Sequence, residues 1–374
     1  MTNNNDKKVL NVPHLRFPEF TEEWVNVSLK DVADFQKERI SSGLLDESTY
    51  ISTENILQNF QGVQSAISIP ANTNVVAYKK NDILLSNIRP YLKKVWFSDR
   101  IGGCSADVFV LRSKTCEPEF LYNVIASDKF INYVMSGAKG VKMPRGDKNQ
   151  MESFSFSIPA VVEQRKISRL FQLLDERIVT QNKIIEDLKK LKSAISERLF
   201  NAIKGDVVVL EDIGDVVKGK QINGEFLSES GKYYVMNGGI EPSGFYNDYN
   251  VEANTISISE GGNSCGYVQF NACPFWSGGH CYTIQNTTDN VKTEYLYQFL
   301  KSKESEIMKL RIGSGLPNIQ KKDLAKFKIT IPNISEQKVI SAFLSSFERK
   351  ADVEMNFVNL LLEEKQYLLR QMFI

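Results

Sequence analysis

Histidine and cysteine are scarce in this chain of 374 residues, and their scarcity excludes several kinds of site. The two histidines cannot build a histidine-rich metal site. The five cysteines are odd in number and form no CxxC pair, so neither a zinc ribbon nor a disulfide framework is indicated. We expect buried thiols in a reducing compartment. The neighbours His280 and Cys281 fit a packed strand better than a metal or nucleophile site.

Long apolar runs and a net charge are also missing. No stretch approaches about 18 apolar residues, and the start MTNNNDKKVL lacks the apolar segment of a signal peptide. We therefore expect no membrane contact and a cytoplasmic protein. The net charge of +1 removes the simplest argument for nucleic-acid binding, although a local basic patch stays open.

Motifs of catalysis are absent as well. The sequence has no Asn-Pro-Pro-aromatic motif of a methyltransferase. No acidic pair followed by Glu-x-Lys stands out in a strand context, as a nuclease would need. Residues 214–221 (GDVVKGKQ) come close to the phosphate-binding loop GxxxxGK[ST]. Gln221 replaces the hydroxyl that binds Mg²⁺, so a turn is the better interpretation. We expect a chain without catalysis of its own.

Glycine and proline are missing from two long segments, which favours helices there. One runs from Ala160 to Lys204 and the other from Asn333 to Ile374, and a proline precedes each. Ser335 is a plausible N-cap for the second helix.

These two segments are copies of each other. Residues 158–200 and 331–373 align at a constant offset of 173. The identical pairs are Ile158/Ile331, Pro159/Pro332, Glu163/Glu336, Gln164/Gln337, Ile167/Ile340 and Phe200/Phe373. An internal repeat of this kind governs the prediction of the whole fold.

Both helices carry the seven-residue apolar spacing of a coiled-coil seam. The apolar seam residues are Leu174, Ile178, Ile185, Leu188, Ile195 and Leu199 in the first copy, and Phe347, Val358, Leu361, Leu368 and Met372 in the second. The same two seam positions are polar in both copies, as Gln181/Glu354 and Lys192/Lys365. About 40 residues make a rod of roughly 60 Å. Two helices that pack separately on a globular body would not need this shared register.

The regions between the helices repeat too. Residues 210–216 resemble 29–35, residues 294–300 (EYLYQFL) resemble 119–125 (EFLYNVI), and Pro317 follows Pro144 by 173. The resemblance fades in the loops, where ligand choice usually lies. In the first copy we expect a helix at 119–130 and strands at 50–52, 74–78, 82–86, 95–97 and 107–112.

The predicted fold class is α+β: two tandem, similar globular α+β domains separated by two long helices that form an antiparallel coiled coil, with a pseudo-two-fold internal repeat. The expected domains are 1–157 with an N-terminal arm, the helix 158–205, 206–330, and the helix 331–374. His14, Phe17, Phe20 and Trp24 are the expected aromatic anchors of the arm.

Several motifs in this order resemble the specificity (S) subunit of type I restriction–modification enzymes. They are LRFPEF…EW (15–24) before LKDVADF (29–35), IP…EQ..I at the start of each long helix, and GSGLPNIQKKDL (313–324). The resemblance implies target-recognition domains that each read one half of a split double-stranded DNA site. It also implies two modification subunits that bring S-adenosylmethionine to an adenine N6, and restriction subunits that can join. No cofactor is expected on this chain.

Loops rich in Arg, Lys and Asn are the candidate DNA contacts, because Arg and Lys suit guanine or phosphate and Asn suits adenine. In the first copy the candidates are Asn87, Arg89, Tyr91, Lys93, Lys94, Lys139, Lys142 and Arg145. In the second they are Lys218, Lys220, Asn263, Arg311, Ser314, Asn318 and Gln320. For each residue alone, a solvated loop side chain is the alternative.

The charge of the second copy is a difficulty for DNA binding. Residues 206–330 hold 12 Lys and Arg against 15 Asp and Glu. We expect partner subunits to complete a positive channel, with weak DNA binding by the chain alone. The alternative function is a non-catalytic adaptor whose coiled coil joins two protein-binding domains; its surface should show an apolar aromatic hot spot.

Overall fold

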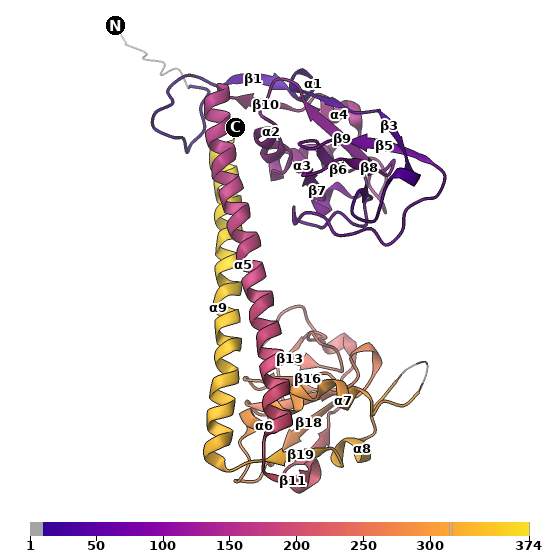
Figure 1. Ribbon diagram of the computed structural model, residues 1–374, viewed down its shortest axis with the longest axis vertical. Helices are drawn as coiled ribbons and strands as arrows, with labels where there is room; N and C mark the ends of the chain where they lie inside the picture. Colours follow the sequence, from indigo (N-terminus) through magenta and orange to yellow (C-terminus); the bar gives the residue numbers. More distant parts are fainter. Residues whose placement is uncertain (1–9, 314, 316, 374) are drawn as a thin grey trace. The chain divides into compact units, whose positions relative to one another are not determined.

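The computed structural model describes residues 10–313, 315 and 317–373. The chain forms two compact units, Met1–Thr180 with Phe357–Ile374, and Gln181–Asn356. This division cuts both long helices, α5 (Val161–Ala202) and α9 (Ile334–Met372), so each unit contains half of each helix (Figure 1). No helix in the described part of the chain is long and apolar enough to cross a membrane.

Within its described residues, the first unit folds into two four-stranded sheets and a two-stranded ribbon. The first sheet is antiparallel, in the order β2 (Ala33–Phe35), β9 (Val108–Ser113), β6 (Ile83–Ser86), β7 (Val95–Phe97). The second sheet has the order β3 (Arg39–Ser41), β5 (Asn74–Tyr78), β8 (Gly102–Cys104), β4 (Tyr50–Ile51). The ribbon pairs β1 (Val25–Ser28) with β10 (Ser155–Ile158), which leads into α5. The five expected strands are confirmed.

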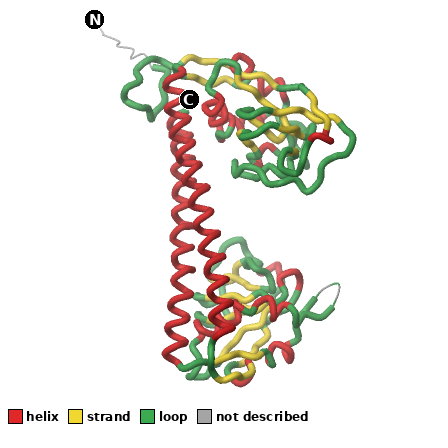
Figure 2. Tube along the Cα trace, in the orientation of Figure 1, coloured by secondary structure: helices red, strands yellow, loops and turns green. Residues whose placement is uncertain are grey.

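The second unit repeats the antiparallel sheet in the same order. That order is β12 (Asp215–Lys218), β18 (Cys281–Gln285), β15 (Thr255–Ser259), β16 (Val268–Asn271). The ribbon recurs as β11 (Asp206–Val209) with β19 (Lys328–Ile331). The remaining sheet is smaller, with the order β14 (Phe245–Tyr246), β13 (Tyr233–Met236), β17 (Trp276–Ser277). Figure 2 shows strands and short helices mixed in each unit. Both units are therefore α+β, as predicted.

Each unit also contains short helices. The first unit has α1 (Leu29–Val32), α2 (Pro118–Ile125), α3 (Asp128–Ser136) and α4 (Lys148–Glu152); the second has α6 (Thr293–Ser302), α7 (Glu304–Met308) and α8 (Lys321–Ala325). The single helix expected at 119–130 is wrong, because α2 ends at Ile125. The Ser127 hydroxyl accepts the N–H of Phe130 at 3.3 Å and starts α3.

The long helices supply part of the core of each unit. In the first unit, Phe171 of α5 is fully buried in one cluster with Phe120 of α2. In the second, Phe200 of α5 packs on Phe299 of α6 with ring centroids 5.3 Å apart. Burying one such ring stabilises the fold by about 1.5–3 kcal/mol. The helix halves therefore share one core with the four-stranded antiparallel sheet of each unit, and the other sheet packs in separate clusters.

A buried glutamine joins each long helix to the helix that follows the sheet. The Gln164 carbonyl oxygen accepts the N–H of Glu117 at 2.8 Å, and its amide donates to the Pro159 carbonyl at 2.8 Å. Gln337 makes the matching bonds to Lys292 and to the Pro332 carbonyl, at 2.8 and 2.9 Å. The repeated Pro and Gln of the sequence thus fix where α2 and α6 begin.

The halves of α5 and α9 lie side by side and antiparallel within each unit (Figure 1). In the first unit, the Lys365 ammonium lies 2.5 Å from Asp175. In the second, Lys192 lies 2.6 Å from Glu348. Lys192 is the repeat counterpart of Lys365, and Glu348 is that of Asp175. The lysine lies on α9 in the first pair and on α5 in the second, as expected for antiparallel copies. The counterparts Gln181 and Glu354 are hydrogen-bonded to each other. Every predicted seam residue is buried or half-buried.

Residues 10–24, here called the arm, pack on the first unit. Trp24 is buried in its core and Phe17 packs against it, whereas His14 is exposed and is no anchor. The Arg16 guanidinium makes two bonds of 2.7 Å to the buried Glu163 carboxylate at the start of α5. The expected N-cap Ser335 is wrong for α9: Asn333 accepts the N–H of Glu336 at 3.0 Å.

Candidate nucleic-acid interface

The two basic loops predicted in the first copy come together in the structure. The N–H of Arg89 donates to the Pro144 carbonyl at 2.8 Å, and the N–H of Gly146 donates to the Asn87 carbonyl at 3.0 Å. Lys139 and Arg145 exchange two backbone hydrogen bonds of 3.0 and 2.9 Å. The loop that follows β6 is therefore held against the loop that follows α3.

The second unit makes the same backbone bonds 173 residues later. The N–H of Gly262 donates to the Pro317 carbonyl at 3.0 Å, and the N–H of Ile319 donates to the Glu260 carbonyl at 2.8 Å. Ile312 and Asn318 exchange two bonds of 2.8 and 3.0 Å. The repeat therefore continues through the loops in the backbone, although the sequence suggested that it fades there.

The side chains on this shared scaffold differ. At positions 173 apart, the second copy has Glu260 in place of Asn87, Gly262 in place of Arg89, Ile312 in place of Lys139, and Asn318 in place of Arg145. The first copy presents cations and an amide, and the second presents a carboxylate and an amide. Because each base pair offers its own donors and acceptors in the major groove, the two scaffolds suit different base pairs.

Arg89 adopts a backbone conformation that favours glycine. Its φ is +51°, and that of its counterpart Gly262 is +74°. A residue with a β-carbon costs about 1–2 kcal/mol in this region, whereas glycine does not. The Arg89 Nε and the Asn87 side-chain oxygen are also buried without a hydrogen-bond partner among the described residues. Strain and unpaired polar atoms at one place are typical of a functional site.

Three of the six candidate cations of the first copy pair with acids at its surface. Lys93 lies 2.6 Å from Asp128, Lys139 lies 2.9 Å from Asp147, and Arg145 lies 3.1 Å from Asp107. Exposed pairs of this kind contribute about 0–1 kcal/mol, so phosphate can compete for the cations.

Three further candidates of the first copy differ in how exposed their side chains are and in whether they already have a partner. The Lys94 ammonium donates to the Thr53 carbonyl at 2.5 Å. Lys142 is exposed and has no ion pair among the described residues, and the Tyr91 ring is 47% exposed. Lys142 and Tyr91 are thus the more available of the three.

Glu260 holds a small polar network in the second copy. Its carboxylate accepts hydrogen bonds from the Lys218 ammonium at 2.7 Å and from the Tyr282 hydroxyl at 3.0 Å. Burial raises the pKa of Tyr282, and the bond to Glu260 raises it further, so the phenol stays a donor. His280 approaches the other Glu260 oxygen at 3.7 Å. The sequence places Glu260 at the position equivalent to Asn87, but the predicted DNA contacts did not include it.

The remaining candidates of the second copy lie near the same loops. Lys220, Asn263, Arg311 and Asn318 are exposed, and Gln320 is half-buried at the start of α8. The Lys220 carbonyl accepts the indole N–H of Trp276 at 2.9 Å. Ser314 lies outside the described residues. Lys218, Asn263 and Asn318 thus lie at the paired loops, whereas Lys220 lies beside β17.

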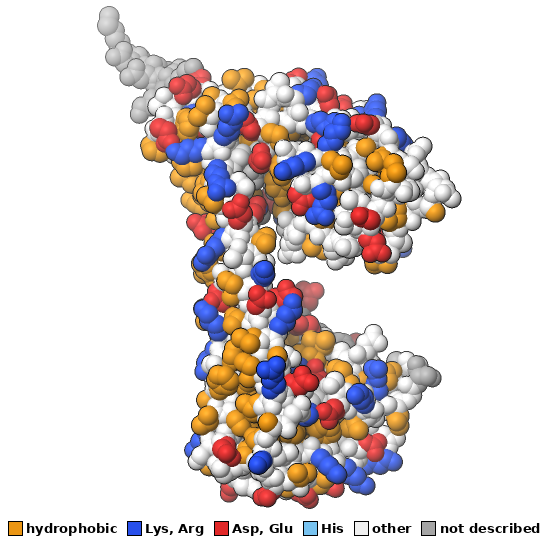
Figure 3. Space-filling view, in the orientation of Figure 1, with side chains coloured by type: hydrophobic (Ala, Val, Ile, Leu, Met, Phe, Trp, Pro, Cys, Tyr) orange, Lys and Arg blue, Asp and Glu red, His pale blue; other side chains and the backbone are white. Residues whose placement is uncertain are grey.

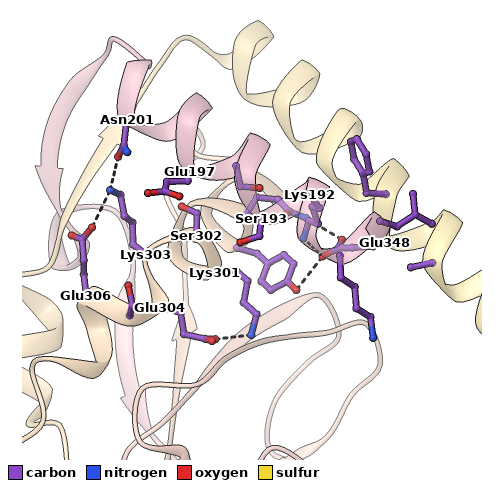
Figure 4. A pocket seen from close by; sticks show the side chains of 18 of the residues that line it. Lys192, Ser193, Glu197, Asn201, Lys301, Ser302, Lys303, Glu304, Glu306 and Glu348 are labelled. Atoms are coloured by element: carbon purple, nitrogen blue, oxygen red, sulfur yellow. Dashed lines mark hydrogen bonds and ion pairs between the residues drawn. The ribbon is translucent and has the colours of Figure 1, made fainter. Parts of the chain in front are cut away.

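The second unit also has a cavity of about 700 Å³ between its helix halves and α6 and α7 (Figure 4). Three of its four lysines are already paired: Lys192 with Glu348, Lys301 with Glu304, and Lys303 with Glu306. Tyr297 and Gln298 also donate to Glu348, at 3.3 and 3.0 Å. These contacts join α6 to the long helices, so the cavity is a poorer anion site than the loops.

The repeated scaffold agrees with the comparison to known protein families. A model described as the type I restriction modification DNA specificity domain matches residues 21–190 and again residues 204–361. The chain belongs to this family. The two matched segments coincide with the two copies of the repeat, each with its own pair of loops.

Individual relatives support the same assignment. A Mycoplasma pneumoniae protein provisionally named a type I specificity subunit is 34% identical over 161 residues, 42% of each chain. The match to a Mycoplasma genitalium relative spans 41% of each chain, so this chain covers about two fifths of these relatives. A type I restriction enzyme specificity subunit of Methanocaldococcus jannaschii is 23% identical and covers 91% of this chain and 89% of that one.

Solved structures share the fold along nearly the whole chain. The crystal structure of a type I restriction-modification system S subunit from M. genitalium has a TM-score of 0.64 and 18% identity, and covers 97% of this chain and 99% of that one. A structure from work on complex assembly of a type I R-M system has a TM-score of 0.60 and 19% identity, and covers 96% and 98%. At these identities the likeness concerns the fold.

Proposed function

We propose that this chain is the DNA sequence-specificity subunit of a type I restriction–modification enzyme. Each unit reads one half of a gapped, two-part site in double-stranded DNA. The observation that carries the proposal is the loop scaffold, which has the same backbone bonds in both units but different side chains. The family assignment supports a role in DNA specificity and disfavours the adaptor alternative.

Each half-site is read by the side chains at equivalent loop positions. In the first unit, Arg89 and Arg145 suit guanine or phosphate, and Asn87 suits adenine. In the second unit, Asn318 and Asn263 offer amide readout, and Lys218 offers a phosphate contact. One well-placed bidentate contact discriminates against the wrong base by about 1–3 kcal/mol.

The two readers are linked by α5 and α9, which are 42 and 39 residues long and uninterrupted. In the proposed function these helices form the coiled coil that sets the spacer between the half-sites. They also dock two modification subunits, and restriction subunits can join this complex.

Catalysis belongs to the modification subunits, which bring S-adenosylmethionine to an adenine N6. The lack of a methyltransferase motif in this chain supports that division. The acidic balance of residues 206–330, 12 cations against 15 acids, supports a positive DNA channel completed by the partners. We therefore expect weak DNA binding by the isolated chain and strong binding by the complex.

Adenine-methylation mapping tests the proposal. DNA from cells that make this chain with its modification subunit is compared with DNA from cells that lack this chain. A gapped, two-part methylated motif that depends on the chain is the expected result, and exchanging residues 206–330 for another such domain should change one half of it. Methylation that does not depend on the chain, or a motif without a gap, would contradict the proposal.

A further inference from the structure

The arm covers a surface at the start of α5 in the first unit. Arg16 pairs with Glu163 through two bonds of 2.7 Å, and Glu163 is only 1% exposed. The Lys166 ammonium lies 4.5 Å from the centre of the Phe17 ring. The N–H of Leu15 donates to the Gln371 carbonyl, near the end of α9, at 3.0 Å. An arginine with a neighbouring aromatic ring thus closes this surface.

No arm covers the equivalent surface of the second unit among the residues that the structure describes. The residues 173 positions after the arm, 183–197, lie inside α5 and form a helix instead. Glu336, the counterpart of the buried Glu163, is exposed. Val339, the counterpart of Lys166, is 69% exposed. The second copy therefore has the surface on which the arm packs in the first copy, but no described segment packs there.

An apolar groove of about 490 Å³ marks this uncovered surface. It lies between the end of α5 and the start of α9, and both segments belong to the second unit. Its lining residues are Leu199, Ala202, Ile203, Ser335, Glu336, Val339 and Ile340. Figure 3 shows hydrophobic side chains gathered along the helices of this unit. A carboxylate at the edge of an apolar groove suits a segment with one cation and one hydrophobic group.

We propose that this groove binds an extended, arm-like segment of the modification subunit, with an arginine on Glu336 and an aromatic side chain over Val339 and Ile340. The inference rests on the proposed function for the identity of the partner. Glu336 lies at the position equivalent to Glu163, which binds Arg16 in the first unit. An arginine suits this position because a planar guanidinium can form two hydrogen bonds with one carboxylate.

The arm of a second copy of this chain is a poorer occupant. That arm is already held in its own unit by the Arg16–Glu163 bonds and by Trp24, which is buried in the core. Leaving this seat would expose Glu163 and break those contacts. A partner segment can enter the groove of the second unit without any such loss.

A labelled peptide with the sequence of residues 10–24 tests the chemistry of the groove on the full chain. Fluorescence anisotropy should show saturable one-to-one binding. E336Q should weaken binding about ten-fold, because it removes the charged partner of the arginine, and R16A in the peptide should have the same effect. V339D should abolish binding; this side chain is exposed, so the fold should tolerate the change.

The matched control is E163Q, which affects the seat of the arm in the first unit. It should leave peptide affinity unchanged. Binding that is lost in E163Q but insensitive to E336Q would reveal exchange of the arm in the first unit and overturn the inference. A lack of saturable binding would also overturn it.

A photo-crosslinking amino acid in place of Val339 identifies the natural occupant. In the complex with the modification subunit, mass spectrometry should find a crosslink to a segment of that subunit that contains an arginine beside an aromatic residue. No such crosslink in a complex that methylates DNA, or a crosslink only to a second copy's arm, would overturn the inference. Failure of the complex with the unmodified chain to assemble or methylate would instead count against the proposed function, and the peptide experiment would still decide whether the groove accepts an arm.

Discussion

Replacing Arg89 with glycine should weaken DNA recognition while leaving the fold intact. Arg89 has a φ of +51°, and its Nε has no hydrogen-bond partner among the described residues. The bond from its N–H to Pro144 belongs to the backbone and remains. Glycine relieves about 1–2 kcal/mol of strain and costs about 0.5–1 kcal/mol in chain entropy. The free energy of unfolding should therefore stay equal or rise by up to about 1.5 kcal/mol.

The loss of the guanidinium should appear in binding. A base contact of this kind contributes about 1–3 kcal/mol, which corresponds to a decrease in affinity of roughly 5- to 150-fold. The assay measures anisotropy of a labelled duplex that carries the methylated motif, bound to the complex of this chain with its modification subunits. Urea unfolding of the chain alone gives the stability.

Asn81→Gly is the matched control. Asn81 has a φ of +71° and lies in the turn before β6, at the opposite end of this strand from Arg89. It should change stability in the same direction as Arg89→Gly and leave DNA affinity unchanged. An unchanged affinity in Arg89→Gly, or a stability loss above about 2 kcal/mol, would refute our interpretation of Arg89 as a strained DNA-contact residue.

Three other predictions concern the two units themselves. Asp175→Ala should lower the free energy of unfolding by about 2 kcal/mol, because the Lys365 side chain, 9% exposed, would lose its partner; an effect as small as that of Glu186→Ala, at an exposed pair with Lys190, would contradict this. Hydrogen bonds from Ser48 and Thr49 lower the pKa of Asp46 to about 2 from 3.8. Its folded-state pKa is below the unfolded value, so its stabilising contribution is present above pH 3.8 and is lost as the pH falls towards 2. The stability difference between wild type and Asp46→Asn should shrink over that range, and a constant difference would speak against it. A thiol reagent at neutral pH should modify the exposed Cys273 quickly and the other cysteines only after unfolding, since burial raises the pKa of Cys104 to about 12 and that of Cys281 to about 11. Fast modification of several thiols in the folded chain would argue against these buried positions.

The internal repeat made much of the fold predictable from sequence. The offset of 173, taken from the long helices, also locates the loop bonds: adding it to Arg89 and Pro144 gives Gly262 and Pro317. Side chains that pack change slowly between copies because the core constrains their size, so the strands could be predicted as well.

What escaped prediction depends on contacts between distant residues. The positive φ of Arg89 is held by its bond to Pro144, and the pairing of Lys93 depends on Asp128. No local pattern encodes either contact. The break between α2 and α3 is different, because Ser127 before Asp128 is a recognisable N-cap that the prediction overlooked.

Exchange of side chains between equivalent loop positions tests the central claim most directly. Asn318→Arg places in the second unit the residue that Arg145 provides in the first, and Arg145→Asn makes the reverse change. Adenine-methylation mapping of each variant complex should show a change in one half of the gapped motif, a different half for each variant, and an unchanged spacer. A variant that altered both halves or the spacer, or two variants that altered the same half, would contradict the account of two independent readers on one repeated scaffold.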